Sequence, residues 1–225
     1  MVEPNFFKGW NNQLVIYDIE SNSLSWPLIF GQDTPGPRAA HATCCDEKRG
    51  LVYLFGGRLS NERLNDFYVG DLTVKNQVHW TQICQSSEGS PWPCGRSWHT
   101  LSYIGPEYLL LYGGYDNDAK PLNDCWFFNI KDNSWMEMKH LSKSERLWHT
   151  AHFVKAVDAL FLFGGVSKNI LHQEEQMHPK TVDSLQISPL PLYLTALQVV
   201  EKNPVLQRKF ASIMPPQASL ATKSS

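Results

Sequence analysis

Three apolar segments that end in paired glycines decide the fold: LVYLFGG at residues 51–57, YLLLYGG at 108–114 and LFLFGG at 160–165. Each run is continuous instead of alternating, which is typical of strands that are buried on both faces. A glycine pair suits a chain that leaves a strand with positive φ or passes close to another backbone, because glycine has no Cβ to clash. The recurrence of these segments predicts a repeat architecture built from short β-strands.

A second signature precedes each apolar run. It is Arg-x-x-His, and it begins at Arg38, Arg96 and Arg146, so the repeat is roughly 50 residues long. Because the motif recurs in every repeat, we expect its histidines to pack and hydrogen-bond between neighbouring repeats. The same reasoning makes His149 and His152 poor candidates for a metal site, since no acidic or cysteine ligand accompanies them.

Each repeat continues beyond its glycine pair with two more strands. Asn-Asp at 65–66 and at 123–124 opens a third strand, and Val-Asp at 182–183 takes this place in the last repeat. Trp80 and Trp135 mark a fourth strand, so one period holds four short strands.

These signatures divide the chain into repeats and a tail. The opening segment resembles only the second half of the unit. The predicted parts are a partial repeat at 1–30, repeats at about 31–88, 89–140 and 141–187, a helical tail at 188–214 and a disordered end at 215–225.

The order Arg-x-x-His, Phe-Gly-Gly, Asn-Asp and Trp resembles the kelch repeat. This resemblance implies an all-β, kelch-type β-propeller of four-stranded blades followed by a short C-terminal α-helical tail. Kelch propellers normally close a ring of about five to seven blades, whereas about three and a half are found here. We therefore expect an incomplete propeller: either a fragment or short isoform, or a ring that something else completes.

Loops that share one face of such a propeller indicate where a ligand binds. Blades are antiparallel meanders, so the loops between the second and third strands and those between blades lie on one face. We call the residues placed there the rim residues: Trp10, Arg58, Arg63, Ser97, Trp98 and Trp148.

The two arginines and the serine of the rim differ from the residues at the same place in other repeats, which suggests a specific role. Arg58, for example, follows its glycine pair where the next two repeats have Tyr115 and Val166. From the residues alone two interpretations remain open. The arginines are either solvated surface charges or part of an anion site, in which guanidinium groups and a serine hydroxyl hold a carboxylate between tryptophans.

A narrower resemblance bears on this choice. FGGRLSNERLND at 55–66, GRSWHT at 95–100 and ERLWHTA at 145–151 resemble a small family of kelch-repeat substrate receptors of cullin-2 ubiquitin ligases. It implies that Arg58, Arg63 and Ser97 hold the carboxylate of proteins that end in glycine, while the three tryptophans line the pocket. The similarity spans nearly the whole chain but only about the C-terminal half of that family's length.

The predicted tail has two interpretations. Leu192, Ala196 and Val200 recur at four-residue steps, as expected of a helix that covers the last blade. The same residues resemble an elongin-binding box, with Ala196 where the pattern prefers cysteine, and Pro215 lies in a segment similar to a cullin-selecting box. This resemblance implies elongin B, elongin C and cullin-2 as partners.

Composition excludes several other classes. Lys and Arg number 20 and Asp and Glu 22, giving a net charge of −2, so nothing favours nucleic acid or an anionic membrane as a partner. Five cysteines without Cys-x-x-Cys spacing suggest free thiols in a reducing compartment, so we expect the cytoplasm or also the nucleus.

We expect no catalysis and no cofactor, since the rim residues include no His or Cys and no nucleophile with a paired base. The leading prediction is a non-catalytic substrate receptor that binds C-terminal glycine. The alternatives are a kelch scaffold without a ligase role and a truncated, poorly functional isoform.

Overall fold

The computed structural model describes residues 10–85, 89–167 and 181–187. Within these ranges the chain is all-β except for one short 3-10 helix, η1 (Lys139–Leu141). The described part of the chain offers no helix with the length and hydrophobicity that crossing a membrane requires. The predicted tail, including Leu192, Ala196, Val200 and Pro215, lies outside the described residues.

The first complete repeat is a four-stranded antiparallel meander in which consecutive strands pair. Its strands are β4 (Ala42–Asp46), β5 (Leu51–Leu59), β6 (Glu62–Asp71) and β7 (Gln77–Ile83). A fifth strand, β3 (Leu28–Phe30), runs parallel to β7 and satisfies its outer edge, which would otherwise be unpaired. The repeat pattern did not predict β3, because this strand belongs to the preceding part of the chain.

The second repeat has the same order, but its first strand is interrupted. Both β8 (Arg96–Ser97) and β9 (Thr100–Gly105) pair with β10. The remaining strands are β10 (Tyr108–Asp116), β11 (Pro121–Asn129) and β12 (Ser134–Glu137).

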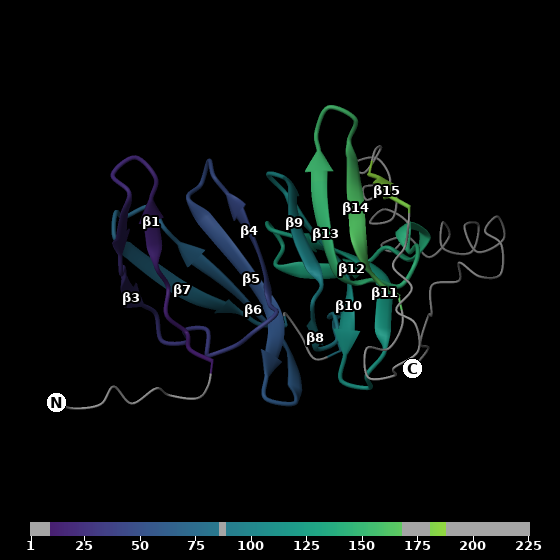
Figure 1. Ribbon diagram of the computed structural model, residues 1–225, viewed down its shortest axis with the longest axis horizontal. Helices are drawn as coiled ribbons and strands as arrows, with labels where there is room; N and C mark the ends of the chain where they lie inside the picture. The colour runs from purple at the N-terminus through teal and green to yellow at the C-terminus, as the bar shows by residue number, and fades with distance from the viewer. Residues whose placement is uncertain (1–9, 86–88, 168–180, 188–225) are drawn as a thin grey trace.

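Shorter sheets stand at the two ends of the described chain. One is the hairpin of β1 (Ile16–Asp18) and β2 (Ser23–Ser25); the other contains β13 (Leu147–Val154), β14 (Ala159–Val166) and β15 (Asp183–Gln186). Figure 1 shows the sheets side by side in chain order. The β5–β6 and β10–β11 turns project from the same edge, opposite the β13–β14 turn.

An ion pair with a buried arginine ties the start of each of the three repeats to its third strand. The arginine of Arg-x-x-His donates to the aspartate and also to the carbonyl of the first glycine in the pair. The ion pairs are Arg38–Asp66, Arg96–Asp124 and Arg146–Asp183, at 2.6, 2.6 and 2.8 Å. Asp183 therefore does in the last repeat what the Asn-Asp aspartates do in the others, and the exchange of Asn for Val182 leaves this frame intact.

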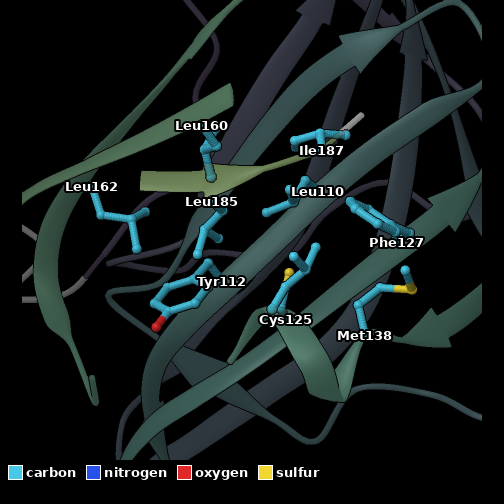
Figure 2. Close-up of a cluster of buried hydrophobic side chains, with 10 residues drawn as sticks. Leu110, Tyr112, Cys125, Phe127, Met138, Leu160, Leu162, Leu185 and Ile187 are labelled. Atoms are coloured by element: carbon cyan, nitrogen blue, oxygen red, sulfur yellow. The ribbon is translucent and has the colours of Figure 1, made fainter. Parts of the chain in front are cut away.

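Apolar clusters fill the space between neighbouring sheets. Figure 2 shows the cluster between the second and third repeats, which brings Tyr112 and Phe127 together with Leu162 and Leu185; Tyr112 lies nearest the two leucines. Two of the three motif histidines lie in these interfaces, since His99 is 5% and His149 is 8% exposed, whereas His41 is exposed. The predicted role between repeats is confirmed for His99 and His149.

The strand of the third apolar run, β14, is not buried on both faces as the sequence predicts. Phe163 in β14 is 41% exposed, whereas the equivalent Phe55 and Tyr112 are fully buried. The cause is that no described sheet covers this face of β14. Its position in the array, and not its own sequence, leaves it exposed.

Candidate functional site

Arg58 and Arg63 stand opposite each other near the tip of the β5–β6 hairpin. Their Cα atoms are partners in the strand register, which shifts by a bulge between Phe55 and Gly57. The Arg58 backbone also pairs with Ala39, at 2.8 and 3.1 Å. Two guanidinium groups therefore leave neighbouring strands at one place.

The Arg63 backbone is fixed by the following repeat. Asn117 accepts from the Arg63 N–H through Oδ1 at 2.7 Å and donates to the Arg63 carbonyl through Nδ2 at 3.0 Å. Gly95 passes so close that a Cβ there would lie 2.1 Å from the Arg63 carbonyl oxygen. Arg63 is thus held beside the segment that leads into β8 and Ser97.

Two tryptophans lie against the Arg58 guanidinium, and a third packs against one of them. Its Cζ lies 5.2 Å from the centre of the Trp10 ring and 5.9 Å from that of Trp98, within cation–π range. The Trp98 ring in turn packs edge-on against Trp148, with centroids 5.2 Å apart.

Two of these tryptophans have an unusual backbone. Trp98 and Trp148 have φ of 58° and 57°, and Ala40, at the same place in the first repeat, has 55°. Such values are uncommon for bulky residues and cost energy. Hydrogen bonds hold them, since the Trp98 N–H donates to Ala40 and the Trp148 N–H to Trp98, at 2.9 and 3.2 Å. The tryptophans are therefore presented side by side by the frame.

Tyr115 joins the two halves of the site, and the sequence analysis did not select it. The Arg63 Cζ lies 4.6 Å from the centre of its ring, which also packs 6.0 Å from Trp98. Tyr115 is the register partner of Ser97. It follows its glycine pair as Arg58 does in the first repeat, and this equivalence was the signal that could have found it.

Neither rim arginine has an acidic partner within the described ranges, unlike the three frame arginines. Arg58 donates through Nε and Nη2 to the Ser60 carbonyl at 3.2 and 3.0 Å. Desolvation lowers the pKa of Arg63, and the positive charge of Arg58 lowers it further, against the opposing effects of Tyr115 and Asp116. The site therefore carries positive charge that an anion would stabilise.

Two buried donors at the site have no hydrogen-bond partner among the described residues. They are the hydroxyl of Ser97, which is fully buried, and Nε of Arg63. Buried polar groups are normally paired, and each unpaired one costs about 1–3 kcal/mol. Within the part of the chain that is described, the arrangement offers donors and positive charge but no matching acceptor.

All six predicted rim residues are described, and contacts or strand register connect them at one edge of the sheets. Their predicted role as a carboxylate pocket stays a prediction. The sequence did not indicate a role for Asn117, because its hydrogen bonds with Arg63 join residues far apart in the chain. All five cysteines are free.

Comparison with known proteins agrees with this architecture. The family model described as the KLHDC2/KLHL20/DRC7 Kelch-repeats domain matches residues 6–186. The chain is 34% identical over 216 residues to Kelch domain-containing protein 1 of Mus musculus and of Homo sapiens, covering 96% of this chain and 51% of each relative. It is 33% identical over 196 residues to Kelch domain-containing protein 2 of Bos taurus, covering 86% of this chain and 45% of the relative.

The chain thus spans about half the length of the curated relatives that it matches. Kelch repeats are generally non-catalytic binding modules, and relatives of this kind imply protein binding. The match over residues 6–186, with the repeated arginine–aspartate frame, shows that this chain belongs to the kelch-repeat family.

Proposed function

We propose that this chain is a non-catalytic substrate receptor of a cullin-2 ubiquitin ligase and that it binds proteins with a C-terminal glycine. The observation that carries the binding half is the pair of buried, unpartnered donors, Ser97 Oγ and Arg63 Nε. They accompany two arginines that form no ion pair within the described ranges. A terminal carboxylate supplies the acceptors and the negative charge that these groups lack.

In this proposal each group has a distinct task. The sheets are blades of a β-propeller, and the turns at one edge form its binding face. Arg58 and Arg63 hold the carboxylate through charge-assisted hydrogen bonds of about 1.5–3 kcal/mol each, and Ser97 donates a further one. The tryptophan walls exclude water and leave little room for a side chain on the last residue, which favours glycine.

Selectivity for the last residue tests the binding half. Peptides that differ only in ending with Gly, Ala or Leu would be titrated into the protein by fluorescence anisotropy. We expect the affinity to fall from Gly to Leu and the Ser97→Ala variant to bind the Gly peptide about 10-fold more weakly. Ser134→Ala, an exposed serine on β12, is the matched control. Equal affinities for Gly and Leu peptides would contradict the proposal.

Partner capture tests the ligase half. The proposal expects the intact chain to retain elongin B, elongin C and cullin-2 in a pull-down, and Leu192→Ala to lose them. Peptide binding without elongin capture would leave a binding domain and refute the receptor role. The proposed location in the cytoplasm and nucleus is checked by imaging of the tagged chain.

A further inference from the structure

Neighbouring sheets of this chain meet through contacts that are repeated from one interface to the next. The Phe55 ring packs edge-on against the His99 ring of the following repeat, with centroids 5.6 Å apart. At the next interface Tyr112 packs against His149 at 5.7 Å. His149 Nε2 also lies 3.0 Å from the Thr100 hydroxyl of the preceding repeat.

The first glycine of each pair makes another such contact, with the arginine carbonyl of the following Arg-x-x-His. A Cβ on Gly56 would lie 2.8 Å from the Arg96 oxygen, and a Cβ on Gly113 would lie 2.6 Å from the Arg146 oxygen. Each interface therefore joins an aromatic-glycine surface to an arginine-histidine surface.

The last sheet presents an aromatic-glycine surface that no described residue covers. We call Thr150, Phe163 and Gly164 the tail face. Phe163 is 41% exposed, Thr150 is exposed, and a Cβ on Gly164 would meet no atom within 4 Å. In the strand register β15 pairs only with Ala159–Leu162 of β14, so the tail face extends beyond it.

The first complete sheet presents the opposite, arginine-histidine surface. It lines a pocket of about 530 Å³, which we call the head pocket, with Arg38, His41, Leu54 and Trp80. His41 is exposed, although the equivalent His99 and His149 are buried. The segments on either side of the β1–β2 hairpin also line the head pocket, through Leu14 and Trp26. Within the described residues β1 pairs only with β2.

We propose that two copies of this chain associate head to tail, with the tail face of each copy in the head pocket of the other. Phe163 then packs against His41 as Phe55 does against His99, and the Thr150 hydroxyl binds His41 as Thr100 binds His149. Gly164 lies against the Arg38 carbonyl. Each copy supplies three sheets with the Arg-x-x-His motif, so two copies stacked in this way give six blades, within the roughly four to eight that propellers close. The proposal does not depend on the ligand of the rim residues.

The test is the mass of the intact chain in solution, measured by light scattering after size exclusion, together with two variants. Phe163→Glu disrupts the tail face and His41→Glu disrupts the head pocket, because each substitution places a charge in the proposed interface. We expect the wild type to have the mass of two chains and each variant alone to dissociate at least about 30-fold more readily. Val157→Glu, at the turn of the same β13–β14 hairpin, is the matched control and keeps the wild-type mass.

Mixing the two variants gives the sharpest result. The Phe163→Glu variant keeps an intact head pocket, and the His41→Glu variant keeps an intact tail face. In a mixture these two surfaces form one wild-type interface, so we expect the two variants to pair with each other. Because a misfolded variant could not be rescued in this way, the mixture separates loss of the interface from loss of the fold. A monomeric wild type, variants that stay dimeric alone, or a mixture that forms no pairs would overturn the proposal. A mass that grows with concentration would overturn the two-copy ring.

Discussion

Replacing Arg63 by methionine should separate stability from binding. In the free protein Arg63→Met removes repulsion from the cross-strand Arg58, about 0.2–1 kcal/mol, and the cost of an unpaired Nε, about 1–3 kcal/mol. It gives up the cation–π contact with Tyr115, 4.6 Å away, about 0.5–2 kcal/mol. Since the removed costs, about 1.2–4 kcal/mol in all, exceed the lost contact, about 0.5–2 kcal/mol, we expect the free energy of unfolding to rise by about 1 kcal/mol, a Tm increase of about 2–4 °C.

Binding should change in the opposite direction. Loss of one charge-assisted interaction weakens a Gly-terminated peptide by about 1.5–3 kcal/mol, roughly 10- to 150-fold in Kd. Scanning calorimetry and fluorescence anisotropy measure the two effects, and Lys131→Met is the control, because Lys131 is exposed in the turn between β11 and β12, away from the rim residues. A variant that loses more than about 1 kcal/mol of stability but binds normally would refute the reasoning, since Arg63 would then be structural.

Three further predictions concern the frame and the support of the site. Gly95→Ala should displace Arg63, because the new Cβ would lie 2.1 Å from the Arg63 carbonyl oxygen, and peptide affinity should fall about 10-fold. The control Gly36→Ala, where a Cβ would meet nothing within 4 Å, should bind the peptide as the wild type does. Asp183→Ala leaves the fully buried Arg146 side chain without its carboxylate and should lower the free energy of unfolding by about 3 kcal/mol, whereas Asp118→Ala, at an exposed ion pair, should cost less than about 0.5 kcal/mol. Burial lowers the pKa of His149 from 6.5 to about 4 and that of His99 well below 6.5. Because the unfolded chain therefore binds more protons than the folded one, the free energy of unfolding should fall as the pH drops below about 6.5. His149 alone should lower it by about 1 kcal/mol between pH 7.5 and 5.5, and denaturant midpoints that do not change over this range would contradict the prediction.

The repeat frame could be predicted from the sequence because its signals are local and recur. The glycine pairs locate β5, β10 and β14, and Asp183 shows that the frame depends on the aspartate and not on the asparagine before it. Arg58, Arg63 and Ser97 were found for the same reason, since each departs from a position that other repeats define, and the three tryptophans were found because their loops share one face. Whether the sheets close as propeller blades stays a prediction.

What the sequence did not predict depends on contacts between distant segments. The parallel strand β3, the Asn117 bridge to Arg63 and the Tyr115 ring under Arg63 each join parts of the chain that no local pattern relates. The exposure of Phe163 is of the same kind, because its run of residues looks like the two buried ones. Such features follow from the order of the sheets.

The central claim is that the rim residues bind a terminal carboxylate, and one calorimetric comparison tests it most directly. A peptide ending in Gly-Gly would be titrated into the protein as the free acid and as the C-terminal amide. We predict that the acid binds at least about 30-fold more tightly than the amide, and that Arg58→Ala and Arg63→Ala reduce this ratio towards one. Equal affinity of acid and amide for the wild-type protein would contradict the account.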